Sequence, residues 1–373
     1  MKNHKLIIFA YDFPPYDGGI ARLCHEIAVG MHSLYSEVLV FSKAKEGVSI
    51  PYNSNKINIT LFPARRGAFE IAAVKHFKQI KHKENYDVLC GQWHPEAILL
   101  FLGGFKQVCI LAHGTEFLSG TSRFRKYFWL KTYCSFILKK SKLIIANSNY
   151  TAGLVKSVCQ TANVKALPLA VNPDFFKPKD KLFESEVLKI CTVSRIEKFK
   201  GHDFIAEVIA SLPKHKRERI RWNIAGRGPD LAYVKQKVAD LSLTSIVSFK
   251  GFVSDNTLPE FYNENDLFIL CSRQSDYTTT VEGFGLVFLE AQSCGVPVIG
   301  TKTGGIPDAI KEGEGGWLIN QDNHNELKEI LLQILADNTL LKDQSEKARQ
   351  RVIKEATWDL YNKQLKELID VDQ

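Results

Sequence analysis

Short runs of apolar and β-branched residues alternate with longer stretches of helical periodicity from one end of the chain to the other. Each short run ends at a Gly, Pro, Asn or Ser, and a helical pattern follows it. This alternation is typical of parallel sheets whose crossover helices cover both faces. The sequence therefore predicts an α/β chain built from doubly wound sheets.

The alternation occurs in two sets, and the 373 residues are enough for two ordinary domains. The first set predicts strands at residues 6–11, 38–41, 59–63, 88–91, 108–113 and 143–147, and the second at residues 188–193, 221–225, 246–250, 267–270, 296–300 and 317–320. Residues 167–174 have the Pro and Asn density of a connector. We therefore expect domains over residues 1–165 and 188–356 with a linker at 166–187. Two such domains facing each other form a cleft at the carboxyl ends of their strands.

Charge is divided unevenly between the halves of the chain. The total is 49 Lys and Arg against 41 Asp and Glu, a formal charge of +8. Residues 1–170 hold 22 Lys and Arg and 10 Asp and Glu, a balance of +12, which leaves 27 against 31, or −4, for residues 171–373. A basic first half and a mildly acidic second half indicate two units with different partners.

Cysteine usage and hydropathy bear on where the protein works. The eight cysteines occur singly, mostly in apolar runs, with neither a C-x-x-C pair nor the spacing of a zinc site. This predicts buried thiols in a reducing compartment. The longest apolar stretch, residues 97–105, is less than half of the roughly 20 residues that a spanning helix needs, and residues 6–10 match a secretory signal poorly. We expect a cytoplasmic protein whose contact with a membrane is at most peripheral.

The most informative segment is the loop around Gly283 and Gly285 together with the apolar run that follows it. The glycines let the loop approach a ligand closely, and the next helix begins with free N–H groups and a positive dipole end that suit a diphosphate. Glu282 in the loop and Glu290 in the helix are separated by roughly the length of a nucleotide sugar. One carboxylate can therefore accept hydrogen bonds from sugar hydroxyls and the other from ribose hydroxyls. Two surface glutamates flanking a buried helix are the structural alternative.

A second cluster, residues 194–203, directly follows the strand predicted at 188–193. Cations between a strand and a helix can clamp a diphosphate and stabilise it as a leaving group. Arg195 and Lys200 are the candidates, and Lys198 competes with them but lacks a following glycine. Such a basic turn on its own is commonly a solvated loop. Together with Glu282 and Glu290, the diphosphate clamp is the favoured interpretation.

These two clusters resemble retaining glycosyltransferases of family four, which have the GT-B fold of two facing Rossmann-like domains. Glu282 and Glu290 match the Glu-x7-Glu signature of that family, and Arg195 and Lys200 match its Arg and Lys, five positions apart. The resemblance extends over nearly the whole chain. It implies that Glu282 contacts the donor sugar and Glu290 the ribose. It also implies contacts with sugar or phosphate from three backbone N–H groups, those of Gly285, Leu286 and Val287.

In the first half the matches are weaker. Two prolines and the pair Gly18-Gly19 follow the first strand, and such a loop admits a phosphate or hydroxyl close to the backbone at a helix start. In the family this loop is part of the floor between donor and acceptor, and Asp12 and Asp17 are candidate ligands for acceptor hydroxyls. The resemblance also implies that His113 touches the donor sugar near its reactive face, although a single His at a strand end is commonly structural.

Four further features complete the resemblance. Glu116 stands where Asp is commoner and is a candidate on the acceptor side. Arg227 lies in a Gly-x-Gly-Pro turn, and Phe252 lies at a strand end whose backbone meets the nucleobase in the family. The segment at about 357–373 resembles the terminal helix that crosses back to the first domain.

The resemblance implies a retaining hexosyltransferase that uses a nucleotide-diphosphate sugar and a hydroxyl acceptor. Departure of the diphosphate would be assisted by Arg195 and Lys200 without a metal, since the one Asp-x-Asp, Asp370 and Asp372, lies in the terminal tail; no other cofactor is expected. The run at 280–298 is most similar to the bacterial branch that includes phosphatidylinositol mannosyltransferases, which favours GDP-mannose and a lipid-linked or glycan acceptor. UDP-glucose, UDP-N-acetylglucosamine and UDP-galactose remain open as donors. A nucleotide-sugar epimerase and a non-catalytic membrane-binding protein are the alternatives of other classes.

The basic excess of the first half is concentrated at residues 75–83 and 123–142. The second stretch has seven cations, no acidic residue and several aromatic side chains, a pattern that fits a helix in an anionic lipid interface. The alternative is a helix packed on the sheet with solvated cations. Nucleic acid is not an expected partner, because no binding motif accompanies the charge. The candidate membrane contacts are Arg123, Arg125, Lys126, Trp129 and Lys131.

Overall fold

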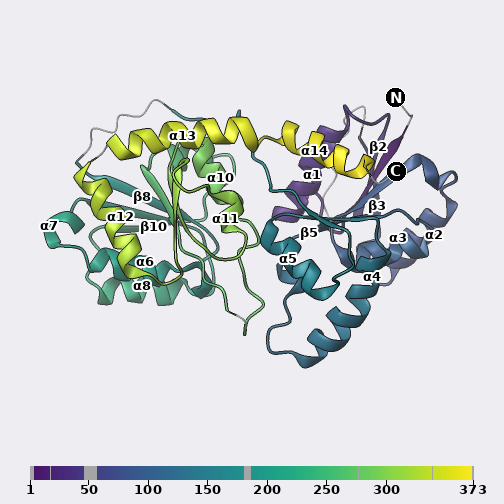
Figure 1. The fold of residues 1–373 in the computed structure, drawn as a ribbon, viewed down its shortest axis with the longest axis horizontal. Helices are drawn as coiled ribbons and strands as arrows, with labels where there is room; N and C mark the ends of the chain where they lie inside the picture. Colours follow the sequence, from purple (N-terminus) through teal and green to yellow (C-terminus); the bar gives the residue numbers. More distant parts are fainter. Residues whose placement is uncertain are drawn as a thin grey trace. The chain divides into compact units, whose positions relative to one another are not determined.

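The computed structural model describes residues 4–16, 18–45, 57–179, 186–275, 277–337 and 339–371. The chain forms two compact units: one runs to Leu167 and is completed by the segment from Trp358 onward, and the other is Pro168–Thr357. Each unit contains one sheet of parallel strands with helices on both faces (Figure 1). The doubly wound α/β architecture predicted from the sequence is confirmed.

The sheet of the first unit has the order β3-β2-β1-β4-β5-β6-β7. Its strands are β1 (Lys5–Phe9), β2 (Val38–Lys43), β3 (Ile57–Phe62), β4 (Tyr86–Cys90), β5 (Cys109–Ala112), β6 (Leu143–Ala146) and β7 (Val164–Ala166). The helices of this unit are α1 (Gly19–Met31), α2 (Ala68–Gln79), α3 (Ile98–Leu102), α4 (Ser135–Lys140), α5 (Asn149–Val158) and α14 (Trp358–Asp370).

One face of this sheet is filled by aromatic rings. The ring of Phe9 on β1 lies 5.0–6.4 Å, between centroids, from those of Phe62, Phe69 and Phe77. On the other face α14 lies beside α1, and the side-chain amide of Asn362 donates to the Glu26 carbonyl at 3.4 Å (Figure 1). Burial of large aromatic surfaces in this way supplies most of the stabilisation of such a core.

The sheet of the second unit has the order β10-β9-β8-β11-β12-β13. Its strands are β8 (Leu188–Val193), β9 (Ile220–Ala225), β10 (Val247–Gly251), β11 (Leu267–Leu270), β12 (Val298–Thr301) and β13 (Gly316–Ile319). The helices α6 (His202–Ala210), α8 (Leu231–Asp240) and α12 (His324–Ala336) pack together on one face. The other helices are α7 (Lys214–Arg217), α9 (Leu258–Asn263), α10 (Leu286–Ser293), α11 (Ile306–Ala309) and α13 (Thr339–Glu355), of which α9, α11 and α13 contact α10.

Every strand predicted from the sequence is present, with ends that differ by no more than two residues. Among the described residues, the strand that was not predicted is β7, which has three residues at the sheet edge; no apolar pattern distinguishes it from the adjacent connector. All eight cysteines are buried free thiols, as predicted. Among the described residues, no helix is both long enough and apolar enough to cross a membrane.

The strand order of each sheet places a crevice at one point of its carboxyl edge. Chain order reverses between β1 and β4 in the first unit and between β8 and β11 in the second. The connections from these neighbouring strands leave on opposite faces, so the loops diverge and open a crevice where ligands of doubly wound sheets bind. We therefore expect a site among the residues that follow these four strands.

Candidate active site

An ion pair spans the crevice of the second unit. Lys200 ends the 3₁₀ turn Lys198–Lys200 after β8, and Glu282 lies in the loop after β11. The Lys200 Nζ lies 2.5 Å from Glu282 Oε2, and the two side chains are only 13% and 17% exposed. The structure thus brings together two of the predicted site residues from loops that are 82 positions apart.

The backbone of Glu282 is fixed by the loop after β12. The Gly305 N–H donates to the Glu282 carbonyl at 2.8 Å. A Cβ atom on Gly304, which has φ +54°, would lie 2.3 Å from that carbonyl oxygen. Glycine at 304 is therefore required for the close approach of the two loops.

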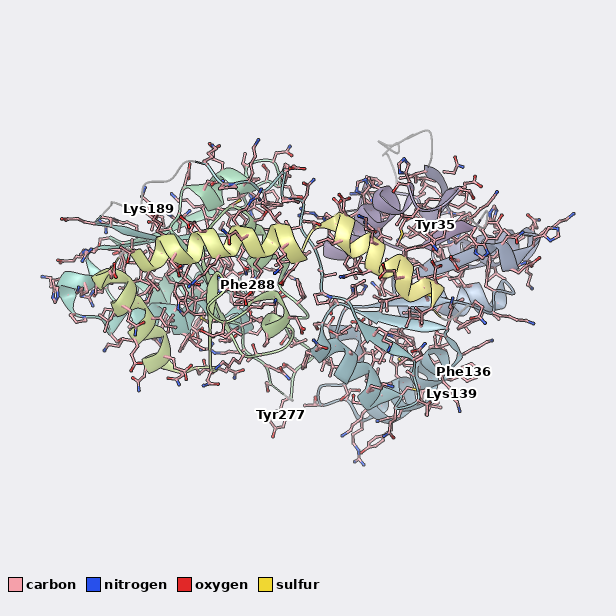
Figure 2. The ribbon with its side chains drawn as sticks, turned by 45° about the horizontal axis from the view of Figure 1, so that its top comes forward. Tyr35, Phe136, Lys139, Lys189, Tyr277 and Phe288 are labelled. Carbon is pink, nitrogen blue, oxygen red and sulfur yellow. The ribbon has the colours of Figure 1, made fainter. Side chains whose placement is uncertain are left out.

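Helix α10 begins immediately after the glycine loop. Gly285 precedes the helix with φ +93°. The helix starts at Leu286, so the N–H groups of the predicted Leu286 and Val287 lie in its first turn, where they have no partner within the helix. Phe288 packs inside the unit (Figure 2). Glu290 follows in the second turn and is 4% exposed. These four residues thus lie on one eight-residue helix.

Glu290 accepts a hydrogen bond from a residue that the motif does not contain. The Tyr262 hydroxyl on α9 donates to Glu290 Oε2 at 3.1 Å in a buried environment. Burial, and then the neighbouring Glu290 carboxylate, raise the pKa of Tyr262 well above its ordinary value. The phenol therefore stays protonated and remains a donor to the carboxylate.

Arg195 is placed differently from Lys200. Its side chain is 73% exposed, and its Nε pairs with Glu197 Oε1 at 2.9 Å. Lys198, the competing cation, lies over the ring of Tyr233 at 5.1 Å. Of the three cations in this loop, the one that contacts Glu282 is Lys200.

An exposed aromatic ring follows β10. Phe252 is 64% exposed, and the guanidinium carbon of Arg227 lies 5.7 Å from its ring centroid. The two loops are joined by the Gly226 N–H, which donates to the Gly251 carbonyl at 2.6 Å. This arrangement presents a π-surface and guanidinium donors at the carboxyl edge of the sheet.

In the first unit, His113 is held at the end of β5. Its Nε2 lies 2.7 Å from the Gly91 carbonyl, which only accepts, so Nε2 carries a proton and is the donor of this hydrogen bond. The Asn147 amide donates to the His113 carbonyl at 3.1 Å, and Glu116 Oε1 accepts from the His113 N–H at 2.6 Å. The predicted acceptor residue Glu116 therefore also holds the backbone of the predicted catalytic His113.

The loop after β1 is described in part. Asp12 is half-buried, Gly18 precedes α1 with φ +134°, and Gly19 is its first residue. An added Cβ atom would meet nothing within 4 Å at either glycine, so the backbone there is open to a ligand. Asp17, the other predicted acceptor ligand, lies outside the described residues.

The predicted membrane contacts separate into two groups. Arg125 donates to the carbonyls of Leu118 and Glu116, and Lys131 donates to the carbonyl of Ser157. Trp129 packs against three rings, those of Trp93, His94 and Tyr133. Arg123 and Lys126 are exposed, and so are four aromatic side chains that were not among the predicted membrane contacts: Phe124, Tyr127, Phe128 and Phe136.

Three residues near the two crevices were not predicted from the sequence. Tyr262 and Glu96 lie in helical segments and show no local signal. Arg273 follows β11, so its position at the carboxyl end of a strand was a usable signal. Among the described residues, no group of three or more His, Cys, Asp or Glu side chains is placed to hold a metal.

Two family models match the chain, and together they run from residue 17 to residue 351. "Glycosyltransferase Family 4" matches residues 17–175, and "Glycosyl transferases group 1" matches residues 174–351. With two parallel α/β units and a carboxylate–lysine pair at the crevice of the second, the chain is a glycosyltransferase with the GT-B fold. It belongs to glycosyltransferase family four.

Relatives of this chain have mixed activities. It is 27% identical over 299 residues to N-acetyl-alpha-D-glucosaminyl L-malate synthase of Bacillus anthracis, covering 76% of this chain and 74% of that one. It is 25% identical over 350 residues, 89% of each chain, to the GDP-mannose-dependent alpha-(1-6)-phosphatidylinositol monomannoside mannosyltransferase of Mycolicibacterium smegmatis. The solved structure of Anabaena Alr3699/HepE in complex with UDP superposes with a TM-score of 0.77 at 20% identity, covering 98% of this chain and 100% of that one.

Proposed function

We propose that this protein transfers a hexose from a nucleotide-diphosphate sugar, with GDP-mannose as the donor, to a hydroxyl of a lipid-linked or glycan acceptor, with retention at the anomeric carbon. The observation that carries the proposal is the Lys200–Glu282 pair at the crevice, 2.5 Å apart and next to the start of α10. A cation for phosphate, a carboxylate for sugar hydroxyls and free helix N–H groups for phosphate oxygens are the groups that this donor requires.

The proposed reaction is a substitution on one face of the sugar. The bond from the anomeric carbon to the diphosphate oxygen breaks while the acceptor oxygen bonds to the same face of that carbon. The departing phosphate oxygen takes the acceptor proton, and the nucleoside diphosphate leaves. Lys200, Arg195 and the first N–H groups of α10 stabilise the charge that develops on the diphosphate, and no step requires a metal.

His113 and Glu290 have separate roles in this proposal. The side chain of His113 contacts the sugar near its reactive face; Glu116 holds the backbone of His113, and the Gly91 carbonyl holds its ring. Glu290 accepts hydrogen bonds from the ribose, and Tyr262 holds its carboxylate. Gly18 and Gly19 admit the donor close to the start of α1, and Asp12 and Asp17 bind acceptor hydroxyls.

Two observations support a GDP donor. The similarity to the mannosyltransferase of Mycolicibacterium smegmatis spans 89% of each chain. The exposed Phe252 ring with Arg227 at 5.7 Å offers a stacking surface and guanidinium donors, and guanine presents two acceptors that a guanidinium can bind together. The UDP complex of the Anabaena protein supports the second candidate, a UDP-sugar transferase in surface polysaccharide synthesis.

A peripheral contact with anionic membrane fits a lipid-linked acceptor. Phe124 and Phe128 stack with their ring centroids 5.2 Å apart and are 67% and 56% exposed, with Arg123 and Lys126 as exposed neighbours. Phe136 and Lys139 project from nearby α4 (Figure 2). Exposed aromatic rings among cations favour an anionic lipid interface. Sedimentation with anionic but not with neutral vesicles, and its loss in F124S/F128S, is expected; equal binding to both vesicles would contradict this contact.

A thermal-shift screen of GDP-mannose, UDP-glucose, UDP-N-acetylglucosamine and UDP-galactose tests the donor, because a ligand of the folded state raises its melting temperature. We expect the largest shift with GDP-mannose. A largest shift with a UDP-sugar would support the second candidate, and no shift with any of them would overturn the proposal.

Conversion of the donor sugar without acceptor would indicate an epimerase. Reversible loss of turnover in EDTA would contradict the metal-independent mechanism.

A further inference from the structure

Arg273 bridges the segments that follow β8 and β11, the two strands between which the crevice of the second unit opens. It is the third residue after β11, and its NH1 donates to both carboxylate oxygens of Asp203 at 2.7 and 2.9 Å. Asp203 is the second residue of α6, the helix that follows the Lys200 loop. This contact, from one guanidinium nitrogen to both carboxylate oxygens, joins the loop after β11 to the segment after β8.

Arg273 also holds the turn that carries Lys200. Its backbone N–H donates to the Phe199 carbonyl at 2.5 Å, and its NH1 lies 3.4 Å from the Lys198 carbonyl. Arg273 thus contacts the carbonyls of both residues that precede Lys200. Gly201, directly after it, has φ +73°, and an added Cβ atom there would lie 2.0 Å from the Cys271 carbonyl oxygen. The Lys200 turn therefore rests on the end of β11.

A third loop fixes the other side of the guanidinium. Arg273 Nε donates to Asp322 Oδ1 at 2.6 Å, and Asp322 follows β13 by three residues. The next residue, Gln274, donates its N–H to Gln321 Oε1 at 2.8 Å. Arg273 therefore contacts the loop after β13 through Asp322 and the segment after β8 through Asp203 and Lys198. Together with its own loop after β11, three segments at the carboxyl edge of the sheet meet at this side chain.

The chemistry of this cluster requires an arginine. Burial alone lowers the pKa of Arg273, but the hydrogen bonds and charges of Asp322 and Asp203 outweigh it and raise the pKa above its ordinary value. Arg273 offers two separate nitrogens in one plane, NH1 to Asp203 and Nε to Asp322. A lysine has a single ammonium nitrogen and cannot reproduce this arrangement. Two carboxylates on one cation leave a net charge of −1 beside the loop, so the cluster itself is not an additional phosphate site.

We propose that Arg273, held between Asp203 and Asp322, is a positioning residue that sets Lys200 at the crevice, where it meets the donor diphosphate. Arg273 acts through the turn Lys198–Lys200 and does not touch the donor. This inference rests on the proposed function for the role of Lys200, but the placement of Lys200 by Arg273 can be measured without a donor.

The kinetic test compares R273Q and R273K with R219Q. Arg219 is a matched control, because it makes backbone contacts at 2.8 and 3.1 Å beside the opposite end of the same sheet. We expect R273Q to lower kcat for GDP release from GDP-mannose about 10-fold or more, with KM changed less than about 3-fold, R273K to recover little of it, and R219Q to stay within about 2-fold. In the K200A background, R273Q should lower kcat by less than about a further 2-fold, because the effects of residues that act through one group are not additive. Unchanged kcat in R273Q, or full additivity with K200A, would overturn the proposal.

A second measurement separates this inference from the proposed function. Acetic anhydride modifies accessible lysine amines, and peptide mass analysis reports modification at Lys200. We expect modification of Lys200 to be about 3-fold or more faster in R273Q and in the milder D322N, and unchanged in R219Q. An inactive wild type with this labelling pattern would reject the donor assignment and retain the positioning role. Unchanged labelling in R273Q and D322N would reject the positioning role even if the wild type is active.

Discussion

The Lys200 ammonium lies 2.5 Å from the Glu282 carboxylate, so the two groups proposed to meet the donor phosphate and the donor sugar neutralise each other. A diphosphate that binds Lys200 must compete with this carboxylate and is repelled by it. Donor binding and rearrangement of the pair are therefore coupled. A sugar hydroxyl that binds Glu282 would offset the loss of its cation, whereas a nucleoside diphosphate without sugar offers no such compensation.

The first prediction concerns E282Q. Removing the negative charge should strengthen binding of GDP about 3- to 10-fold, since Lys200 loses its competitor, while turnover of GDP-mannose should fall by at least about 100-fold. Isothermal titration calorimetry with GDP measures the first effect and GDP release the second. E207Q is the control, because Glu207 also pairs with a lysine at 2.5 Å, Lys237, between α6 and α8. Weaker GDP binding in E282Q than in wild type would contradict the competition.

The second prediction concerns the hydroxyl of Tyr262. Y262F removes the donor to Glu290 and should lower the free energy of unfolding by about 1–3 kcal/mol, since the lost hydrogen bond is buried and charged. GDP binding should weaken about 5-fold, because the carboxylate is no longer oriented. Y35F is a matched control: the Tyr35 hydroxyl also donates to a buried carboxylate, that of Asp87 in the first unit, at 2.8 Å. Urea unfolding and calorimetry should find similar stability losses but weaker GDP binding only in Y262F; equal GDP affinities would contradict a role of Glu290 in binding.

The sequence predicted the strands well and the local partners of the site residues poorly. Alternation of short apolar runs with helical periods is a local signal, so twelve of the thirteen strands in the described part of the chain were recognised. The contacts of Arg273 with Asp203 and Asp322 depend on β8, β11 and β13 sharing one sheet, and periodicity does not specify the order of strands. Arg195 shows the same limit. Its side chain pairs with the nearby Glu197, and the spacing of residues in the sequence does not predict this partner.

The direction of Trp129 illustrates a second limit. The segment Arg125–Cys134 has π-helical hydrogen bonds, which rotate successive side chains differently from a helix of 3.6 residues per turn. Trp129 consequently packs against Trp93, while Phe124 and Phe128 are exposed. A helical projection of the sequence assumes the ordinary period and therefore misassigns the faces of this segment.

The third prediction concerns the close approach at Gly201. G201A should lower stability by about 2–4 kcal/mol, the sum of left-handed backbone strain and of the clash with the Cys271 carbonyl, which a Cβ atom would approach to 2.0 Å. G313A separates the two effects, because Gly313 has φ +76° against +73° for Gly201 and nothing within 4 Å of its added Cβ. Thermal unfolding should show a larger loss in G201A than in G313A, together with a fall in turnover in G201A alone. Equal losses would mean that the loops can separate without consequence.

The fourth prediction concerns the dependence of stability on pH, which arises from Glu96 beneath the loop after β1. Its Oε1 accepts the Tyr11 N–H at 3.1 Å, while Oε2 has no hydrogen-bond partner among the described residues, and the side chain is buried. Burial raises the pKa of Glu96 from its ordinary 4.5 to about 8; two backbone N–H groups oppose this, and the nearby Asp12 adds to it. The thiols of Cys24 and Cys90 also face this carboxyl, and burial raises the pKa of each.

Between pH 4.5 and 8 the folded protein therefore keeps a proton on Glu96 that the unfolded chain has released. Because the folded state binds more protons, this group lowers the stability as the pH rises, by up to about 1.4 kcal/mol per pH unit, and its contribution levels off above pH 8. E96Q is uncharged throughout and can still accept the Tyr11 N–H, so E96Q should gain stability relative to wild type between pH 5 and 8. The stability of E84Q should change with pH in parallel with that of wild type, because Glu84 is exposed and its lowered pKa places its titration below this range. Chemical unfolding at pH 5, 6.5 and 8 measures the difference, and parallel curves for E96Q and wild type would mean that Glu96 is ionised in the folded protein.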